Sequence, residues 1–294
     1  MANQKIKYSV FLEKNIFHVL NDVAMSGGGA EAVKQLVEKF LETGIVNPTA
    51  RMFSPLVTSY LLNDNVSGAL DCVIETHNKY QIVARLHDVL VKLVEVGDKE
   101  QLQKAMMFCM QSVGDANALY DLVFAFLSAG KYDQARRVIE KPGFRYRAQR
   151  VEWYATKCIK TGFEKQLEEL VEITKDLFEC DRDNMYFHLL KLYGNKNDWQ
   201  KCLDVWTRLQ EEQVTVRPRT MKYLADILRK NGQEVTFETP KITMNPDAAI
   251  ETVREELIEK KIPPGAVGTK ALFKKLIVNN FELDKARDYY KVEF

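Results

Sequence analysis

Apolar residues recur along most of this sequence at the spacing of an amphipathic α-helix. Between residues 119 and 127, five apolar side chains fall at positions i, i+3, i+4, i+7 and i+8, so they line one face of a helix. The same spacing returns in residues 86–94 and 151–159. The pattern therefore predicts helices rather than strands.

Each of these predicted helices ends at a short polar or glycine-containing turn. Five markers, about 32 to 35 residues apart, define successive turns: Gly97, Gly130, Gly162, Asn197 and Gly232. Glycine, and after it asparagine, is favoured at the left-handed position that stops a helix. We therefore predict a left-handed backbone at all five markers.

A second amphipathic stretch follows the turns, so that two helices make one repeat. These predicted second helices include residues 102–109, 167–178 and 202–209, and two further pairs lie upstream, 16–25 with 30–43 and 52–62 with 66–77. Two helices per repeat and a period in the low thirties predict an all-α protein, an α-solenoid of helix-turn-helix repeats.

The period breaks after the last marker. The next segment is rich in β-branched residues and contains Pro240 and Pro246, which favours an extended linker over a helix. Helical patterns then return and continue almost to the C-terminus. We predict repeats in residues 13–232, a linker in 233–247 and a further helical, repeat-like segment in 248–294, together forming a segment of a longer array.

Composition and charge narrow the possible partners. The chain has 294 residues, is 46% apolar and 28% charged, and carries a net charge of +1. A nearly neutral chain can bind nucleic acid only through local patches. Because no apolar run approaches the roughly 20 residues of a membrane span, we expect no membrane contact. Residues 1–10 lack the features of a signal or transit peptide, so the chain is expected to be cytosolic or to lack its leader.

No catalytic or metal-binding pattern stands out. The five cysteines lie singly without a C-x-x-C pair, so we expect reduced, small apolar residues, and the four histidines lack metal-ligand spacing. Residues 27–29 and 265–270 lack the features of a phosphate-binding loop. Trp153, Trp199 and Trp206 sit at helical spacing and are expected to pack between repeats. We predict no enzyme, no metal, no cofactor and no small-molecule substrate.

The residues around two turns resemble pentatricopeptide repeats. Residues 129–135 (Ala-Gly-Lys-Tyr-Asp-Gln-Ala) and 197–206 are similar to the turn and second helix of that family, and 212–218 is similar to its proline-containing end. The signals of ankyrin and tetratricopeptide repeats do not recur. Residues 178–186 and 232–237 further resemble the leucine-rich pentatricopeptide-repeat family of animal mitochondria, in its middle-to-late part.

This resemblance, which covers about residues 33–240, carries functional expectations. It implies a mitochondrial protein, in the matrix with the nucleus as a second location, that binds single-stranded RNA. It also implies that the bound mitochondrial mRNA is stabilised and that its polyadenylation and translation are supported. A small partner protein with an RNA-recognition motif is implied as well.

Pentatricopeptide proteins read about one base per repeat through one residue of the first helix and the last residue of the repeat. That family pattern places the reading pairs at Ser54 with Ala84, His87 with Asn117, Tyr120 with Arg150, Glu152 with Arg182, and Phe187 with Arg217, while Lys222 opens an incomplete sixth. The family's usual pairs, a small hydroxyl or Asn with Asp or Asn, are absent. We therefore predict no base-specific readout.

Arg150, Arg182 and Arg217 end successive repeats. Regular stacking would align them with Lys222 along one edge, where they could hold phosphates without sequence preference. The alternative is that they are ordinary arginines of solvated loops.

A second candidate for RNA contact lies in residues 141–150. There, Phe144 and Tyr146 alternate with Arg145 and Arg147, an alternation that suits stacking and cationic contacts to a single strand. The alternative is an irregular loop whose aromatic rings fold back onto the core. At the level of the whole chain, two hypotheses stay open: a scaffold that holds RNA by its backbone, and a solenoid that docks a partner protein while RNA binds elsewhere in the longer protein.

Overall fold

The computed structural model describes residues 2–44, 46–177 and 180–239, with side chains from residue 12 onward. Within these ranges the regular structure is helical and contains no strand, which confirms the all-α prediction. The segment predicted at 248–294, the second half of the predicted linker and Phe178 lie outside the described residues. The predicted domain boundaries therefore stay predictions.

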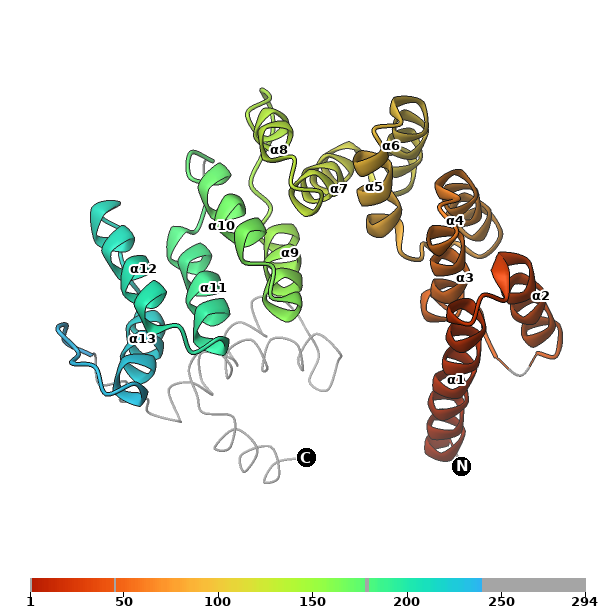
Figure 1. Cartoon of the computed structure of the whole chain (residues 1–294), viewed down its shortest axis with the longest axis horizontal. Helices are drawn as coiled ribbons and strands as arrows, with labels where there is room; N and C mark the ends of the chain where they lie inside the picture. Colours follow the sequence, from red (N-terminus) through yellow and green to blue (C-terminus); the bar gives the residue numbers. More distant parts are fainter. Residues whose placement is uncertain (1, 45, 178–179, 240–294) are drawn as a thin grey trace, which may run out of the picture. The chain divides into compact units, whose positions relative to one another are not determined.

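The helices alternate between a first and a second helix of each repeat (Figure 1). The first helices are α1 (Ala2–Met25), α3 (Ala50–Leu62), α5 (Leu86–Val96), α7 (Asp115–Ser128), α9 (Ala148–Thr161), α11 (Arg182–Asn195) and α13 (Pro218–Lys230). The second helices are α2 (Gly29–Glu42), α4 (Val66–Tyr80), α6 (Lys99–Val113), α8 (Tyr132–Ile139), α10 (Glu164–Ile173) and α12 (Trp199–Glu211).

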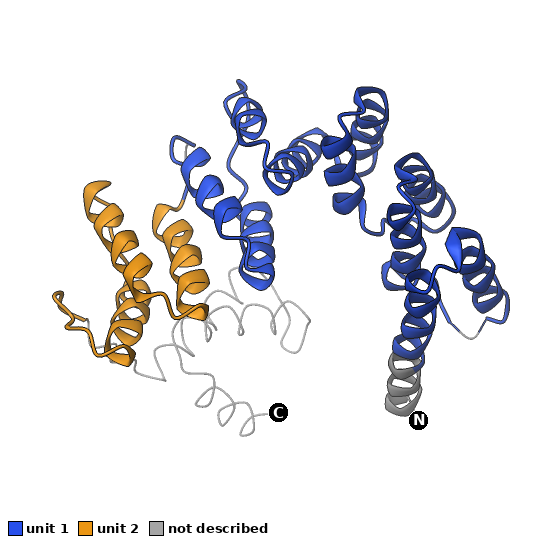
Figure 2. Cartoon of the chain, in the orientation of Figure 1, with its two compact units in different colours: residues 1–180 blue, residues 181–294 orange. Residues whose placement is uncertain are grey.

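The chain divides into two compact units, residues 1–180 and 181–294 (Figure 2). In the first unit each first helix packs on the second helix of its own repeat, and α5, α7 and α9 also pack in succession. In the second unit α11 packs on both α12 and α13. Contacts within a repeat and between neighbouring first helices are those of an α-solenoid.

Backbone chemistry explains where these helices end. The five marker residues all have positive φ, from 57° at Asn197 to 80° at Gly97, which confirms the left-handed turns predicted from the sequence. Two of the helices that follow these markers, α6 and α12, are capped at their starts: the carboxylates of Asp98 and Asp198 accept the backbone N–H groups of Gln101 and Lys201 at 3.0 and 3.1 Å.

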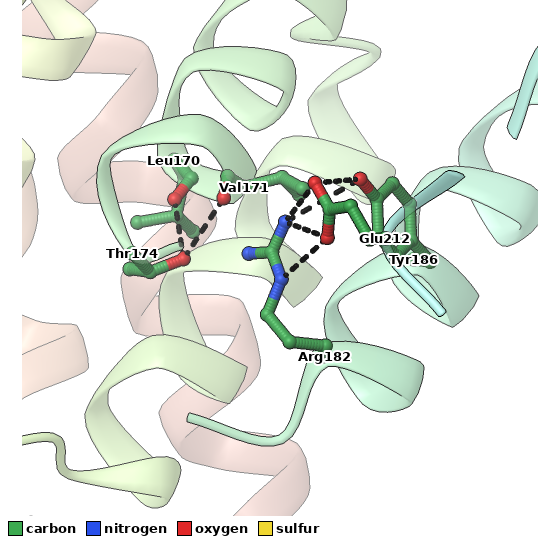
Figure 3. A network of polar contacts seen from close by, with 6 residues as sticks. All are labelled: Leu170, Val171, Thr174, Arg182, Tyr186 and Glu212. Atoms are coloured by element: carbon green, nitrogen blue, oxygen red, sulfur yellow. Dashed lines mark hydrogen bonds and ion pairs between the residues drawn. The ribbon is translucent and has the colours of Figure 1, made fainter. Parts of the chain in front are cut away.

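Two helices differ from the prediction. Helix α10 ends at Ile173 rather than continuing to residue 178, and α1 begins at Ala2 instead of residue 16. At the end of α10, the Thr174 hydroxyl donates to the carbonyls of Leu170 and Val171 at 2.7 and 3.2 Å (Figure 3). Such a local side-chain bond competes with the backbone ladder, so it favours termination at this position.

Four cysteines confirm their expected role as small apolar residues. Burial raises the pKa of the Cys72, Cys109, Cys158 and Cys202 thiols to about 12, and none of the five cysteines forms a disulfide. Cys180, at the boundary of the first unit, is partly exposed.

Candidate nucleic-acid interface

Helix α7 is packed against by α5, α6, α8, α9 and α10, so it is buried on most sides. Tyr120, a predicted reading residue of this helix, is only 2% exposed. Its hydroxyl donates to the Arg145 carbonyl at 2.8 Å and accepts the Arg147 N–H at 2.9 Å. In this conformation Tyr120 anchors the loop after α8 and is not accessible to a ligand.

The predicted aromatic and basic segment is this same loop. The Phe144 ring lies 4.7 Å from the Tyr120 ring, so it folds back onto the core, as the alternative interpretation expected. Arg145 and Arg147 are exposed, and Tyr146 is half-buried. Their side chains could reach a ligand, although Arg147 already donates to the Asn117 side chain at 3.1 Å.

The repeat-end arginines are all paired with carboxylates of neighbouring helices. In the first unit, Arg150 at the start of α9 forms an ion pair with Asp121 of α7. In the second unit, Arg217 pairs with Asp181 and also lies 3.6 Å from the carboxylate of Asp183. These contacts neutralise much of the charge that a row of arginines would otherwise offer to phosphates.

Arg182 is the most enclosed of the three arginines. Its guanidinium donates to both carboxylate oxygens of Glu212, with Nε and Nη2 at 3.1 and 3.0 Å from Oε2 (Figure 3). The Tyr186 hydroxyl donates to the same carboxylate at 2.8 Å. Burial, followed by this hydrogen bond, raises the pKa of Tyr186. The arrangement joins the start of α11 to the end of α12.

The remaining predicted reading positions differ in accessibility. The Ser54 hydroxyl donates to the Ala50 carbonyl at 2.7 Å, and its predicted partner Ala84 is buried. Glu152 and Lys222 are exposed. Phe187 is half-buried, with the Lys191 Nζ and the Arg219 guanidinium carbon 4.4 and 4.7 Å from its ring centre. The RNA contacts assigned to these residues stay predictions.

His87 makes a contact that crosses a whole repeat. This residue belongs to α5, yet its ring lies edge-on to Trp153 of α9 with centres 5.7 Å apart. A second contact between the same two helices is the ion pair of Asp88 in α5 with Lys157 in α9, at 3.7 Å. Burial, and then the nearby Lys157, lowers the pKa of His87 to about 4, so the ring is neutral at pH 7.

Trp153 packs against neighbouring repeats, as the sequence predicted, yet it is not buried. Its ring centre lies 5.7 Å from that of His87 in α5 and 5.9 Å from that of Phe124 in α7, and 46% of the residue is exposed. Two cations of its own helix flank the indole: the Arg150 guanidinium carbon and the Lys157 Nζ lie 5.8 and 5.9 Å from its ring centre. Their spacing of i−3 and i+4 from the tryptophan was a signal available in the sequence.

A different feature lies between the second helices α4 and α6. A groove of about 450 Å³ is lined by Ile74 and His77 of α4 and by Met107 and Phe108 of α6. Met107 is 55% exposed, and Met110 on the same helix is 40% exposed. Methionine is common on surfaces that adapt to protein partners.

Across the part of the chain that the structure describes, no group of three or more His, Cys, Asp and Glu residues is arranged to hold a metal ion. In the same residues, no helix has the length and apolar character needed to span a bilayer.

Sequence comparison identifies close relatives. No protein-family model matches the chain. It is 41% identical over 278 residues to the leucine-rich PPR motif-containing proteins, mitochondrial, of Rattus norvegicus and Mus musculus, which covers 95% of this chain and 19% of each relative. The corresponding protein of Xenopus tropicalis is 47% identical over 235 residues, covering 80% of this chain and 17% of the relative. The chain thus spans about a fifth of the length of these relatives.

Proposed function

We propose that this chain, which is related over most of its length to the leucine-rich PPR motif-containing mitochondrial proteins, is a segment of a mitochondrial scaffold that holds single-stranded RNA. The observation that carries the proposal is this relationship, which extends across helix pairs of the pentatricopeptide type in both units. Repeats of this class bind RNA at about one base per repeat. The ligand is therefore a single strand rather than a duplex.

The contacts of the predicted reading residues favour loose holding over sequence readout. Tyr120 is anchored in the core, Asn117 is engaged with Arg147, and His87 is tied to Ser128 at 3.2 Å. A base edge would have to displace these contacts before it could be read. Holding RNA without sequence preference fits a role in stabilising mitochondrial mRNA and supporting its polyadenylation and translation in the matrix, with the nucleus as a second location.

The proposed scaffold acts by binding and needs neither a cofactor nor a small-molecule substrate. Its proposed protein partner is small and carries an RNA-recognition motif, as the family resemblance implies. Two proteins bound to the same strand would each cover a part of it.

A second candidate function is protein docking, with RNA bound elsewhere in the longer protein. The groove between α4 and α6, which the exposed Met107 lines, favours this alternative. The pairing of Arg150, Arg182 and Arg217 with carboxylates supports it too, because little positive charge is left uncompensated at the repeat ends.

A salt-dependent titration separates the two functions. Fluorescently labelled poly(A) and a mixed-sequence single strand would be titrated with the whole chain at several salt concentrations. RNA holding predicts similar affinity for both strands and a slope of log K against log salt of about −0.7 for each phosphate contacted. Absence of binding to both strands at low salt would refute RNA holding for this chain.

A further inference from the structure

We propose that Trp153 is a stacking platform for one base of a single-stranded nucleic acid. The inference rests on the proposed RNA-binding function and names a residue outside the predicted reading pairs. Its starting point is the contrast between Trp153, which is 46% exposed, and the aromatic residues behind it, Phe124 and Tyr154, which are fully buried.

The indole is held by a rigid support. Phe124 and Tyr154 stack with ring centres 4.5 Å apart and planes 2° from parallel, and the Phe124 ring lies 5.9 Å from the Trp153 ring. The Tyr154 hydroxyl is hydrogen-bonded to Ser128 at 2.9 Å, and Ser128 also contacts His87, whose ring abuts the indole. A side chain fixed in this way loses little conformational freedom when a ligand binds, which favours binding.

The charges around the indole favour a base over an isolated phosphate as the ligand. Arg150 and Lys157 flank the ring, but each also contacts a carboxylate, Asp121 and Asp88 respectively. The two cations can therefore orient a strand beside the ring without making a strongly positive site. Stacking on an aromatic side chain needs only the flat face of a base, and every base has one.

This type of contact agrees with the absence of a base code at the predicted reading positions. Stacking tolerates any sequence, so a scaffold can hold RNA without discriminating among strands. The platform also lies where His87 and Lys157 link α5 to α9, so its position is fixed by two repeats at once.

The test uses the whole chain with Trp153→Leu, Trp153→Phe and a matched control, Phe163→Leu, which removes another partly exposed ring in the same unit. Short poly(A) is the ligand, and inorganic polyphosphate is the phosphate-only probe. We expect Trp153→Leu to weaken poly(A) binding roughly 5- to 100-fold, the loss of one stacked base, and Trp153→Phe to weaken it less. Phe163→Leu should bind like wild type.

Tryptophan emission gives an independent readout. Poly(A) should quench the emission of the wild-type chain, polyphosphate should not, and most of the quench should disappear in Trp153→Phe. If Trp153→Leu fails to fold, as judged by its circular dichroism, the Phe variant and the wild-type quench still decide the question.

The outcomes separate this inference from the function on which it rests. If wild type binds poly(A) and both Trp153 variants bind it equally well, the platform is refuted and the RNA-binding function stands. If polyphosphate quenches emission as poly(A) does, the site takes phosphate and the inference is also refuted. If wild type binds no RNA at low salt, the proposed function itself fails.

Discussion

Replacing Arg182 with Met tests whether this arginine, predicted to bind RNA, instead stabilises the fold. In the structure its guanidinium donates to both carboxylate oxygens of Glu212, and the two side chains are only 14% and 16% exposed. The substitution keeps an unbranched apolar stem and removes the charge and the hydrogen-bond donors of the guanidinium. Glu212 would then lose a bidentate partner in a poorly hydrated position.

The expected cost follows from this geometry. Breaking a fully buried ion pair by removing one partner costs about 3–5 kcal/mol. Because both side chains keep some exposure and Glu212 keeps the Tyr186 hydroxyl, we expect a loss of about 2–3 kcal/mol for Arg182→Met. Adding Glu212→Gln should restore about 1 kcal/mol or more, since the carboxylate charge that Arg182 had balanced is gone while an acceptor for Tyr186 remains.

Urea unfolding followed by tryptophan fluorescence measures this loss. A Trp153→Phe background leaves only Trp199 and Trp206 as tryptophan reporters. Both lie in α12, the helix that ends next to Glu212. The control is Arg229→Ala, which removes an arginine of the same unit that is 55% exposed and forms a pair at 3.5 Å with Asp226. Such an exposed pair contributes at most about 1 kcal/mol.

Measurements of RNA binding can refute the structural role of Arg182. Under conditions where all variants are folded, the structural role predicts that Arg182→Met binds poly(A) within about twofold of wild type, with an unchanged salt slope. An unchanged urea midpoint together with a salt slope reduced by about 0.7 would show that Arg182 holds a phosphate and that the reasoning from its ion pair is wrong.

Three further outcomes concern other contacts of the core. Tyr120→Phe should lower the free energy of unfolding by about 1–3 kcal/mol and speed tryptic cleavage within residues 140–147, because both hydrogen bonds to that loop are lost. Unchanged cleavage would contradict the anchoring role. Burial lowers the pKa of His87 and of His188 to about 4, below the ordinary value near 6.5, so the unfolded state binds more protons between these values. Stability should therefore decrease as pH falls from about 6.5 toward 4, by up to about 1.4 kcal/mol per pH unit for each histidine. Urea midpoints of wild type and His87→Gln, measured across this pH range, test the expectation. An equal dependence of the midpoint on pH in both proteins would exclude His87 as a cause. At about pH 8, a thiol reagent should label Cys180 in the native chain and the four buried cysteines only after unfolding, which mass spectrometry can count; rapid native labelling of any buried cysteine would contradict the burial described.

The sequence predicted the helices well because their signals are local. Gly97 and Asn197 terminate helices through their own backbone preference, so their left-handed turns could be predicted without knowing any neighbour. The end of α10 was missed because the helical pattern of apolar residues continues beyond Thr174, whose hydroxyl bonds back to the carbonyls of Leu170 and Val171.

The candidate site was harder to predict because it depends on which repeats face each other. The partner of Arg150 lies 29 residues away and that of Arg182 lies 30 residues away, so a shift of one residue in helix register would change both pairs. Helical spacing predicted that Trp153 packs between repeats, but it could not show that the surrounding helices leave nearly half of the residue uncovered.

The contacts from α5 to α9 limit how this protein can change its length. In a solenoid whose repeats touch only their immediate neighbours, a repeat can be inserted or deleted and the flanking interfaces simply re-form. Here His87 and Asp88 reach past α7 to Trp153 and Lys157, so the three repeats that begin with α5, α7 and α9 share one set of contacts. Gain or loss of a repeat between them would separate both pairs, and these three repeats should therefore unfold as one block.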